Sequence, residues 1–165
     1  MIFLKSIYHL NCFIKKLIFL LCYGKKSFQI GRKLQFRKGF SLVIEKPGKV
    51  IIGNDCFFNN YCSVAAKNKI LIGNGTIFGE NVKIYDHNHK FNRFDIPIKN
   101  QGFSTGSVEI GNHCWIGSNV TILKGAKIGD NCVIGAGCVV NQDVPSGTIL
   151  KPSSTIWEKI KIIPK

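Results

Sequence analysis

The stretch IGNHCWIGSNVTILKGAKIGDNCVIGAGCVV, residues 110–140, repeats a six-residue pattern along its whole length. An aliphatic residue opens each hexapeptide, at positions 110, 116, 122, 128, 134 and 140, and a small or modest side chain stands four residues later. Glycine directly follows the aliphatic residue in four of the six cases. This period fits neither an α-helix nor an ordinary β-hairpin. It is typical of a parallel β-helix, in which three hexapeptides form one triangular coil.

The same spacing occurs upstream of residue 110. Large apolar residues stand six apart in three further sets, which are Ile30, Phe36 and Leu42, then Ile52, Phe58 and Val64, then Ile72, Phe78 and Ile84. All the sets together predict an all-β fold of about five coils, stacked at the strand spacing of about 4.8 Å. We expect a helix over residues 1–27, the β-helix over 28–148 and a tail over 149–165.

The cysteines fit this register. Five of the seven occupy the small inward position of a hexapeptide, and these are Cys56, Cys62, Cys114, Cys132 and Cys138. Free cysteine packs as a small hydrophobe, so we expect these residues in the core. The odd number of cysteines and the lack of a CxxC pair disfavour a disulfide framework and a zinc site. A reducing, cytoplasmic compartment is the default expectation.

The N-terminal third is strongly basic. Residues 1–51 contain eleven Lys or Arg and a single acid, Glu45, within a chain of net charge +14. Lys5, Lys15 and Lys16 interrupt the apolar residues 2–23, which argues against a membrane span and favours an interfacial helix. The alternative is a helix that packs on its own domain or on a neighbouring subunit. Anionic lipid is the expected partner, at the inner membrane face, since no nucleic-acid-binding motif is present.

The six-residue rhythm stops at DHNHKFNRFDIPIKNQGFSTGS, residues 86–107. Long loops in compact domains are usually functional, and we expect this one to leave the coil as a wall of a site. Neutral imidazole accepts a proton near neutral pH, so His87 is a candidate general base. Asp86 either holds the tautomer of a neighbouring imidazole or caps the loop. A zinc site made of His87, His89 and His113 is the competing hypothesis.

Residues 110–147 resemble the left-handed β-helix acyltransferases with hexapeptide repeats, above all the maltose, galactoside and xenobiotic O-acetyltransferases and their relatives from polysaccharide gene clusters. The resemblance implies a left-handed coil, acetyl transfer from acetyl-CoA, no metal, and a homotrimer with active sites between subunits. It also implies that His87 is the base and that Asn60, in FFNNYCSV (57–64), stabilises the oxyanion. For the trimer we expect Val120 and Ile122 to point outward.

Acetyl-CoA contacts follow from the same resemblance. Ser118 and Ala136 match positions whose backbone binds pantetheine, and Trp115 matches a tryptophan that borders the groove. Asn141 and Gln142 are further candidate cofactor contacts, at which the chain departs from the family, where Thr-Lys is common. Four residues of the C-terminal region are candidates for contacts with the phosphates and adenine, namely Lys151, Trp157, Lys159 and Lys161.

The acceptor site is expected at the loop. Asp86, His89, Phe91 and Asp95 are the candidate acceptor-binding residues. The sequence thus predicts an acetyl-CoA-dependent O-acetyltransferase that acts on a sugar hydroxyl in cell-surface polysaccharide synthesis. The alternatives are an amino-sugar N-acetyltransferase and a non-catalytic trimeric scaffold in a glycan assembly complex.

Overall fold

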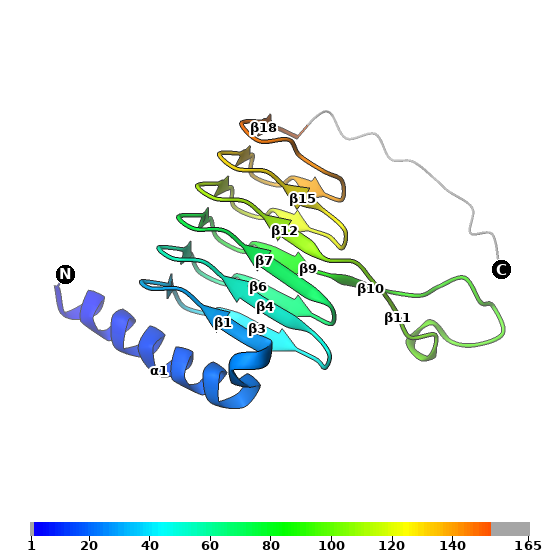
Figure 1. Cartoon of the computed structure of the whole chain (residues 1–165), viewed down its shortest axis with the longest axis horizontal. Coiled ribbons are helices and arrows are strands. Elements are labelled where there is room, and N and C mark those ends of the chain that lie inside the picture. Colours follow the sequence, from blue (N-terminus) through cyan, green and yellow to red (C-terminus); the bar gives the residue numbers. More distant parts are fainter. Residues whose placement is uncertain (1, 153–165) are drawn as a thin grey trace.

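The computed structural model describes residues 2–152, with side chains from residue 10 onward. After one helix the chain winds as a parallel β-helix with three sheets (Figure 1). Sheet A contains β1 (Phe28–Ile30), β4 (Lys49–Ile52), β7 (Lys69–Ile72), β12 (Val108–Ile110) and β15 (Lys127–Ile128). Sheet B contains β2 (Gln35–Phe36), β5 (Phe57–Phe58), β8 (Ile77–Phe78), β13 (Trp115–Ile116), β16 (Val133–Ile134) and β18 (Ile149–Leu150). Sheet C contains β3 (Ser41–Ile44), β6 (Ser63–Ala66), β9 (Lys83–Tyr85), β14 (Thr121–Ile122) and β17 (Val139–Val140). The predicted parallel β-helix is confirmed.

A sixth turn follows the five coils that the hexapeptides predict. Val144 forms a parallel bridge with Ile128, and β18 pairs with β16. The step from Ile128 to Val144 is two residues shorter than the step from Ile110 to Ile128. The shorter corner breaks the count of six, which is why the period alone ends one turn early.

The core is a column of alternating large and small side chains. The small inward positions are all buried, and they are Cys56, Cys62, Thr76, Val82, Cys114, Val120, Ala126, Cys132 and Cys138. Phenylalanine fills the centre of the first coils, and the rings of Phe58 and Phe78 stack with their centroids 4.2 Å apart. The prediction that the cysteines of the repeat are core residues is therefore confirmed.

The expectation that Val120 and Ile122 point outward is wrong. Both side chains are fully buried. Side chains alternate along a strand, so two residues separated by one position share a face, and here that face is the core. Thr121, between them, is the residue of β14 that faces outward.

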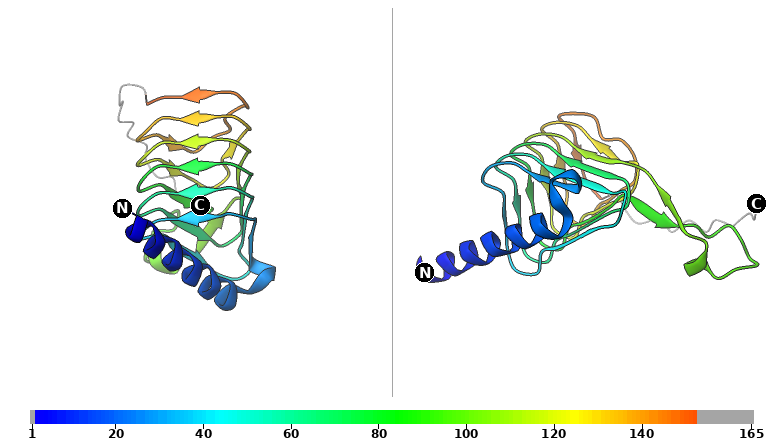
Figure 2. Two further views of the ribbon diagram at one scale, coloured as in Figure 1. Left: turned by 90° about the vertical axis from the view of Figure 1, so that its left-hand side faces the viewer. Right: turned by 60° about the horizontal axis from the view of Figure 1, so that its bottom comes forward.

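Helix α1 (Ile2–Ser27) lies across the open end of the first coil (Figures 1 and 2). Cys12 is buried there, and Phe19 packs edge-on against Phe28 with ring centroids 6.2 Å apart. Lys16 Nζ donates to the carbonyl of Leu34 at 3.1 Å. One face of the helix therefore packs on its own domain, as the alternative to the membrane hypothesis proposes.

The opposite face of α1 is apolar and open. Its exposed residues are Leu10, Phe13, Ile14, Leu17, Ile18 and Leu21. Within residues 2–152, no helix combines the length and the hydropathy needed to cross a bilayer.

The extruded loop leaves the coil where the interrupted repeat predicts it (Figure 2). It begins and ends as an antiparallel hairpin of β10 (His87–His89) and β11 (Phe103–Thr105), with the short 3-10 helix η1 (Ile98–Asn100) between them. The N–H of Gly106 donates to the carbonyl of Asp86 at 2.9 Å and closes the base of the hairpin.

Candidate active site

The candidate residues gather at two edges of sheet C. We call the turns that join sheet B to sheet C the B/C corner, and the turns that join sheet C to the next strand of sheet A the C/A corner. The extruded loop is the C/A corner of the third coil, so His87 belongs to that edge. Asn60 follows β5 and belongs to the B/C corner.

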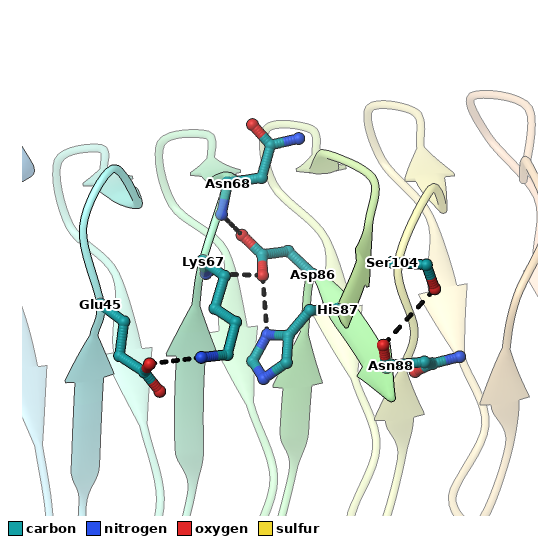
Figure 3. Close-up of polar contacts among 7 residues, drawn as sticks. All are labelled: Glu45, Lys67, Asn68, Asp86, His87, Asn88 and Ser104. Carbon is teal, nitrogen blue, oxygen red and sulfur yellow. Dashed lines mark hydrogen bonds and ion pairs between the residues drawn. The ribbon is translucent and has the colours of Figure 1, made fainter. Parts of the chain in front are cut away.

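Asp86 and His87 form a pair at the root of the loop (Figure 3). The Asp86 side chain is fully buried, and its Oδ1 lies 2.9 Å from His87 Nδ1. Backbone N–H groups also donate to this carboxylate, from Lys67 to Oδ1 at 2.8 Å and from Asn68 to Oδ2 at 2.7 Å. A buried carboxylate needs such partners. Asp86 therefore both orients the imidazole and anchors the loop to the coil below.

This burial corrects one prediction from the sequence. Asp86 is expected to contact the acceptor, but its side chain has no exposed surface. It lies behind His87, which is 16% exposed. Because a carboxylate only accepts hydrogen bonds, Nδ1 carries the hydrogen in the neutral ring and Nε2 keeps a free lone pair. That lone pair is what a general base needs.

Three further side chains surround His87. The Phe103 ring meets the imidazole edge-on, with centroids 5.4 Å apart. Lys67 Nζ lies 3.9 Å from the Phe103 centroid and forms an ion pair with Glu45. Neither Lys67 nor Phe103 is predicted as a site residue from the sequence. The available signal was Glu45, the only acid among the first 51 residues.

The outer part of the loop holds a concavity of about 720 Å³. Two candidate acceptor-binding residues, His89 and Phe91, line it together with Arg93 and Gln101. Asp95 is not among the lining residues, and its carboxylate forms an exposed ion pair with Arg93. Arg93 Nε donates to Asp95 Oδ1 at 3.0 Å, which lowers the pKa of the Asp95 carboxyl.

Asn60 shares the B/C corner with two of the predicted acetyl-CoA residues. The register of sheet B places residues 60, 80, 118 and 136 at one position in successive coils. Asn60 Nδ2 donates to Glu80 Oε1 at 2.9 Å, and the Glu80 N–H donates to Ser118 Oγ at 3.1 Å. Ala136 is exposed on this corner. An amide has two N–H donors, so one of them stays free for a ligand.

The remaining cofactor candidates lie elsewhere. Trp115 is 56% exposed on the outer face of sheet B, at the start of β13. Asn141 and Gln142 are exposed on the C/A corner, the edge that carries His87. Lys151 is exposed at the end of the described chain, whereas Trp157, Lys159 and Lys161 lie outside the described residues.

Sheet C separates the two halves of the site within one chain. Strand β6 crosses the sheet with four residues, which is a length of about 13 Å at about 3.3 Å per residue. Asn60 precedes this strand, and Asp86 binds the backbone that follows it. A single chain therefore does not bring Asn60 next to His87.

The histidines of the zinc hypothesis are not brought together either. His113 stands in the corner between sheets A and B with a φ of 55°, and its ring covers Gly75. His87 and His89 belong to the extruded loop at another corner of the coil. The described residues hold no group of three or more His, Cys, Asp or Glu arranged to bind a metal ion.

Comparisons with known proteins agree with this fold. Residues 107–142 match the family model described as bacterial transferase hexapeptide (six repeats). WbbJ of Escherichia coli (strain K12), assigned provisionally to lipopolysaccharide biosynthesis as an O-acetyl transferase, is 30% identical over 158 residues, which cover 90% of this chain and 79% of WbbJ. The chain belongs to the hexapeptide-repeat acetyltransferases.

Two solved structures are similar. A maltose O-acetyltransferase from Clostridium difficile 630 is 32% identical with a TM-score of 0.61, over 74% of this chain and 64% of that one. The acetyltransferase VCA0836 from Vibrio cholerae, in complex with acetyl coenzyme A, is 28% identical with a TM-score of 0.61, over 72% of this chain and 63% of that one. This chain thus spans slightly less than two thirds of each solved chain.

Proposed function

We propose that this protein transfers the acetyl group of acetyl-CoA to a hydroxyl of a sugar acceptor, with His87 as the general base. The observation that carries the proposal is the Asp86–His87 pair, in which a buried carboxylate fixes an imidazole at the root of the loop. The similarity to WbbJ and to a structure that binds acetyl coenzyme A supports the reaction class and the cofactor. The WbbJ similarity also supports a role in cell-surface polysaccharide synthesis.

The chemistry needs no covalent intermediate on the protein. Nε2 of His87 takes the proton of the acceptor hydroxyl as its oxygen attacks the thioester carbonyl. The free N–H of Asn60 stabilises the oxyanion of the tetrahedral intermediate. The C–S bond then breaks, and the imidazolium returns the proton to the departing sulfur, which yields the acetyl ester and CoA. Asp86 stabilises the imidazolium while it exists.

We propose further that the protein is a homotrimer whose sites form between copies. The C/A corner of one copy supplies His87 and Asn141, and the B/C corner of its neighbour supplies Asn60 and Ser118. Both corners border sheet C, so this sheet faces the neighbouring copies. Its outward residues in four of the coils are small or modest in size, as close packing of copies requires, and they are Ser41, Val43, Ser63, Ala65, Thr121 and Val139.

We also propose that the protein binds a membrane surface. The exposed apolar face of α1 and the basic N-terminal third suit an interface of anionic lipid. Such a position would bring the site to acceptors that are assembled at the inner membrane face.

One experiment tests the reaction. The full-length protein is incubated with acetyl-CoA and a panel of methyl glycosides, nucleotide sugars and amino sugars, and the products are analysed by mass spectrometry. We expect acetyl esters of neutral sugars. Products on amino sugars alone would replace the proposal with N-acetyl transfer, and binding of ligands without any product would replace it with the scaffold.

A further inference from the structure

Beside the imidazole, the C/A corner carries an ion pair that the proposed chemistry does not use. Glu45 lies in the corner of the first coil and Lys67 in the corner of the second, one coil before His87 and to its left in Figure 3. A second pair, Lys33 and Asp55, joins the same two coils at the corner between sheets A and B, with Nζ and Oδ1 3.5 Å apart. The two pairs differ in how firmly the protein holds them.

Lys67 is fixed from three sides. Its backbone N–H donates to Asp86, its ammonium lies over the Phe103 ring, and it donates to Glu45 Oε2. Its side chain is 14% exposed, whereas the Lys33 side chain is 80% exposed. Withdrawing an ammonium from water is unfavourable unless partners replace the water. The carboxylate and the aromatic face are those partners, so Lys67 cannot move without disturbing the hairpin of the loop.

One carboxylate oxygen of Glu45 accepts a hydrogen bond from Lys67, and the other is available to a ligand. Its side chain is 57% exposed, and within residues 10–152 the protein's hydrogen bond to this carboxylate goes to Oε2. The hydrogen bond from Lys67 is also the main cause that lowers the pKa of the Glu45 carboxyl, and the charge of a protonated His87 lowers it further. Glu45 is therefore an ionised carboxylate within electrostatic reach of the candidate base, with Oε1 free to accept hydrogen bonds.

We propose that Glu45 binds the hydroxyl of the acceptor next to the one that is acetylated, and that Lys67 is its positioning residue. This assignment rests on the proposed function. An ionised carboxylate accepts hydrogen bonds and does not donate them, so it binds donor groups such as a sugar hydroxyl and disfavours anionic groups at the same place. The site then requires an acceptor with two neighbouring hydroxyls, one opposite His87 Nε2 and one at Glu45 Oε1.

The test pairs protein variants with deoxy acceptors. The probes are the methyl glycoside that the wild-type enzyme acetylates fastest and its analogues that lack one hydroxyl at a time. For the parent glycoside we expect Glu45→Gln to raise KM by about 10- to 100-fold, the range for a hydrogen bond to a charged group. For one deoxy analogue, wild type and Glu45→Gln should have the same KM, because the missing hydroxyl is the partner of Glu45.

Further variants separate this role from a structural one. Lys67→Met should raise the KM for the glycoside in the same direction, and adding it to Glu45→Gln should change little, because the two residues act as one unit. The KM for acetyl-CoA should stay at the wild-type value in all these variants. Lys33→Met and Asp55→Asn remove the matched pair that joins the same two coils, and they should leave both KM values unchanged.

The outcomes distinguish this assignment from the proposed function. If the wild type acetylates the glycosides and Glu45→Gln keeps its full selectivity against every deoxy analogue, the assignment of Glu45 is wrong and the proposed function stands. A uniform loss on all analogues would show a structural role and would equally overturn it. If the wild type acetylates no glycoside, the proposed function fails and the assignment fails with it.

Discussion

Asp86 serves the fold and the site with one carboxylate. It receives hydrogen bonds from two backbone N–H groups of the coil below and from the His87 ring. The position of the candidate base is thus set by the coil and not by the loop that follows it.

We expect His87→Ala to lower turnover by about 10²- to 10⁴-fold, the usual contribution of a general base. Affinity for acetyl-CoA should not change, because the residue lies at the acceptor end of the site. Steady-state rates and calorimetric titration with acetyl-CoA measure the two quantities. His89→Ala should have a much smaller effect, and His113→Asn, at a distant corner, serves as the control. Turnover of His87→Ala at the wild-type level would remove His87 from the mechanism.

The thiols of the core give a second prediction at this scale. Burial raises the pKa of Cys56, Cys62 and Cys114 above the ordinary value of 9.0, so these groups stay protonated and unreactive. A thiol reagent at pH 8 should react quickly with the exposed Cys22 and with the other six only after unfolding. Because the folded state holds these protons more tightly than the unfolded chain, stability should fall as the pH rises above 9. Rapid reaction of several thiols in the native protein would contradict the core assignment.

At the scale of elements, a ladder of side chains joins the coils at the corner between sheets A and B. Each Oδ1 accepts the N–H of the equivalent residue one coil earlier, from Arg32 to Asn54 at 2.8 Å, from Asn54 to Asn74 at 2.7 Å, and from Asn74 to Asn112 at 2.8 Å. The preceding glycines allow this close approach. A Cβ on Gly73 would lie 2.6 Å from the backbone of Gly111.

Asn74→Ala should therefore destabilise the fold by about 0.5–1.5 kcal/mol, the net contribution of a hydrogen bond, because the N–H of Asn54 loses its acceptor. Gly73→Ala should destabilise it further, since the clash is with backbone. Denaturant unfolding followed by circular dichroism measures both. The exposed Asn100→Ala in the loop is the matched control and should stay within about 0.5 kcal/mol. An equal loss in Asn74→Ala and Asn100→Ala would show that the ladder contributes nothing.

Helix α1 carries the prediction about membranes. Replacing Leu17 and Leu21 by Gln should abolish binding to vesicles that contain phosphatidylglycerol, while the fold stays intact because both side chains point away from the coil. Binding of the wild type should weaken with salt. Sedimentation of the protein with the vesicles measures this binding. Wild-type protein that stays in the supernatant at low salt would leave α1 with its packing role alone.

At the scale of the whole molecule, the separation of Asn60 and His87 predicts complementation between copies. The His87→Ala and Asn60→Ala proteins should each have little activity. After they are unfolded together and refolded, about a quarter of the sites in a random trimer would combine an intact His87 with an intact Asn60 from its neighbour. Activity should return towards that fraction. Mixed oligomers that remain inactive would place both residues of each site in one copy.

The fold could be predicted from the sequence because a six-residue period runs through the first five coils, apart from the inserted loop, and position in the period indicates which cysteines are buried. Resemblance to the motifs of the family identified four candidate site residues, which are His87, Asn60, Ser118 and Ala136. The sequence could not show that Lys67 and Glu45 meet beside the imidazole, because they are 22 residues apart and belong to different coils. It misplaced Val120 and Ile122 because an exposed face was inferred without the strand alternation, and Asp86 because motif proximity does not reveal burial.

The helix that covers the first coil also shields the end of the solenoid. A solenoid end presents a row of unpaired strand groups that can template another chain. Here α1 occupies those groups: Phe36 N–H donates to Cys12 Sγ, and the carbonyls of Leu34 and Leu42 accept from Lys16 and Tyr23. Without residues 1–27, the edges of β1, β2 and β3 would be free, and solenoids could join end to end into fibres. We therefore expect the helix to prevent end-to-end joining. Light scattering by the protein without residues 1–27 should detect the fibres.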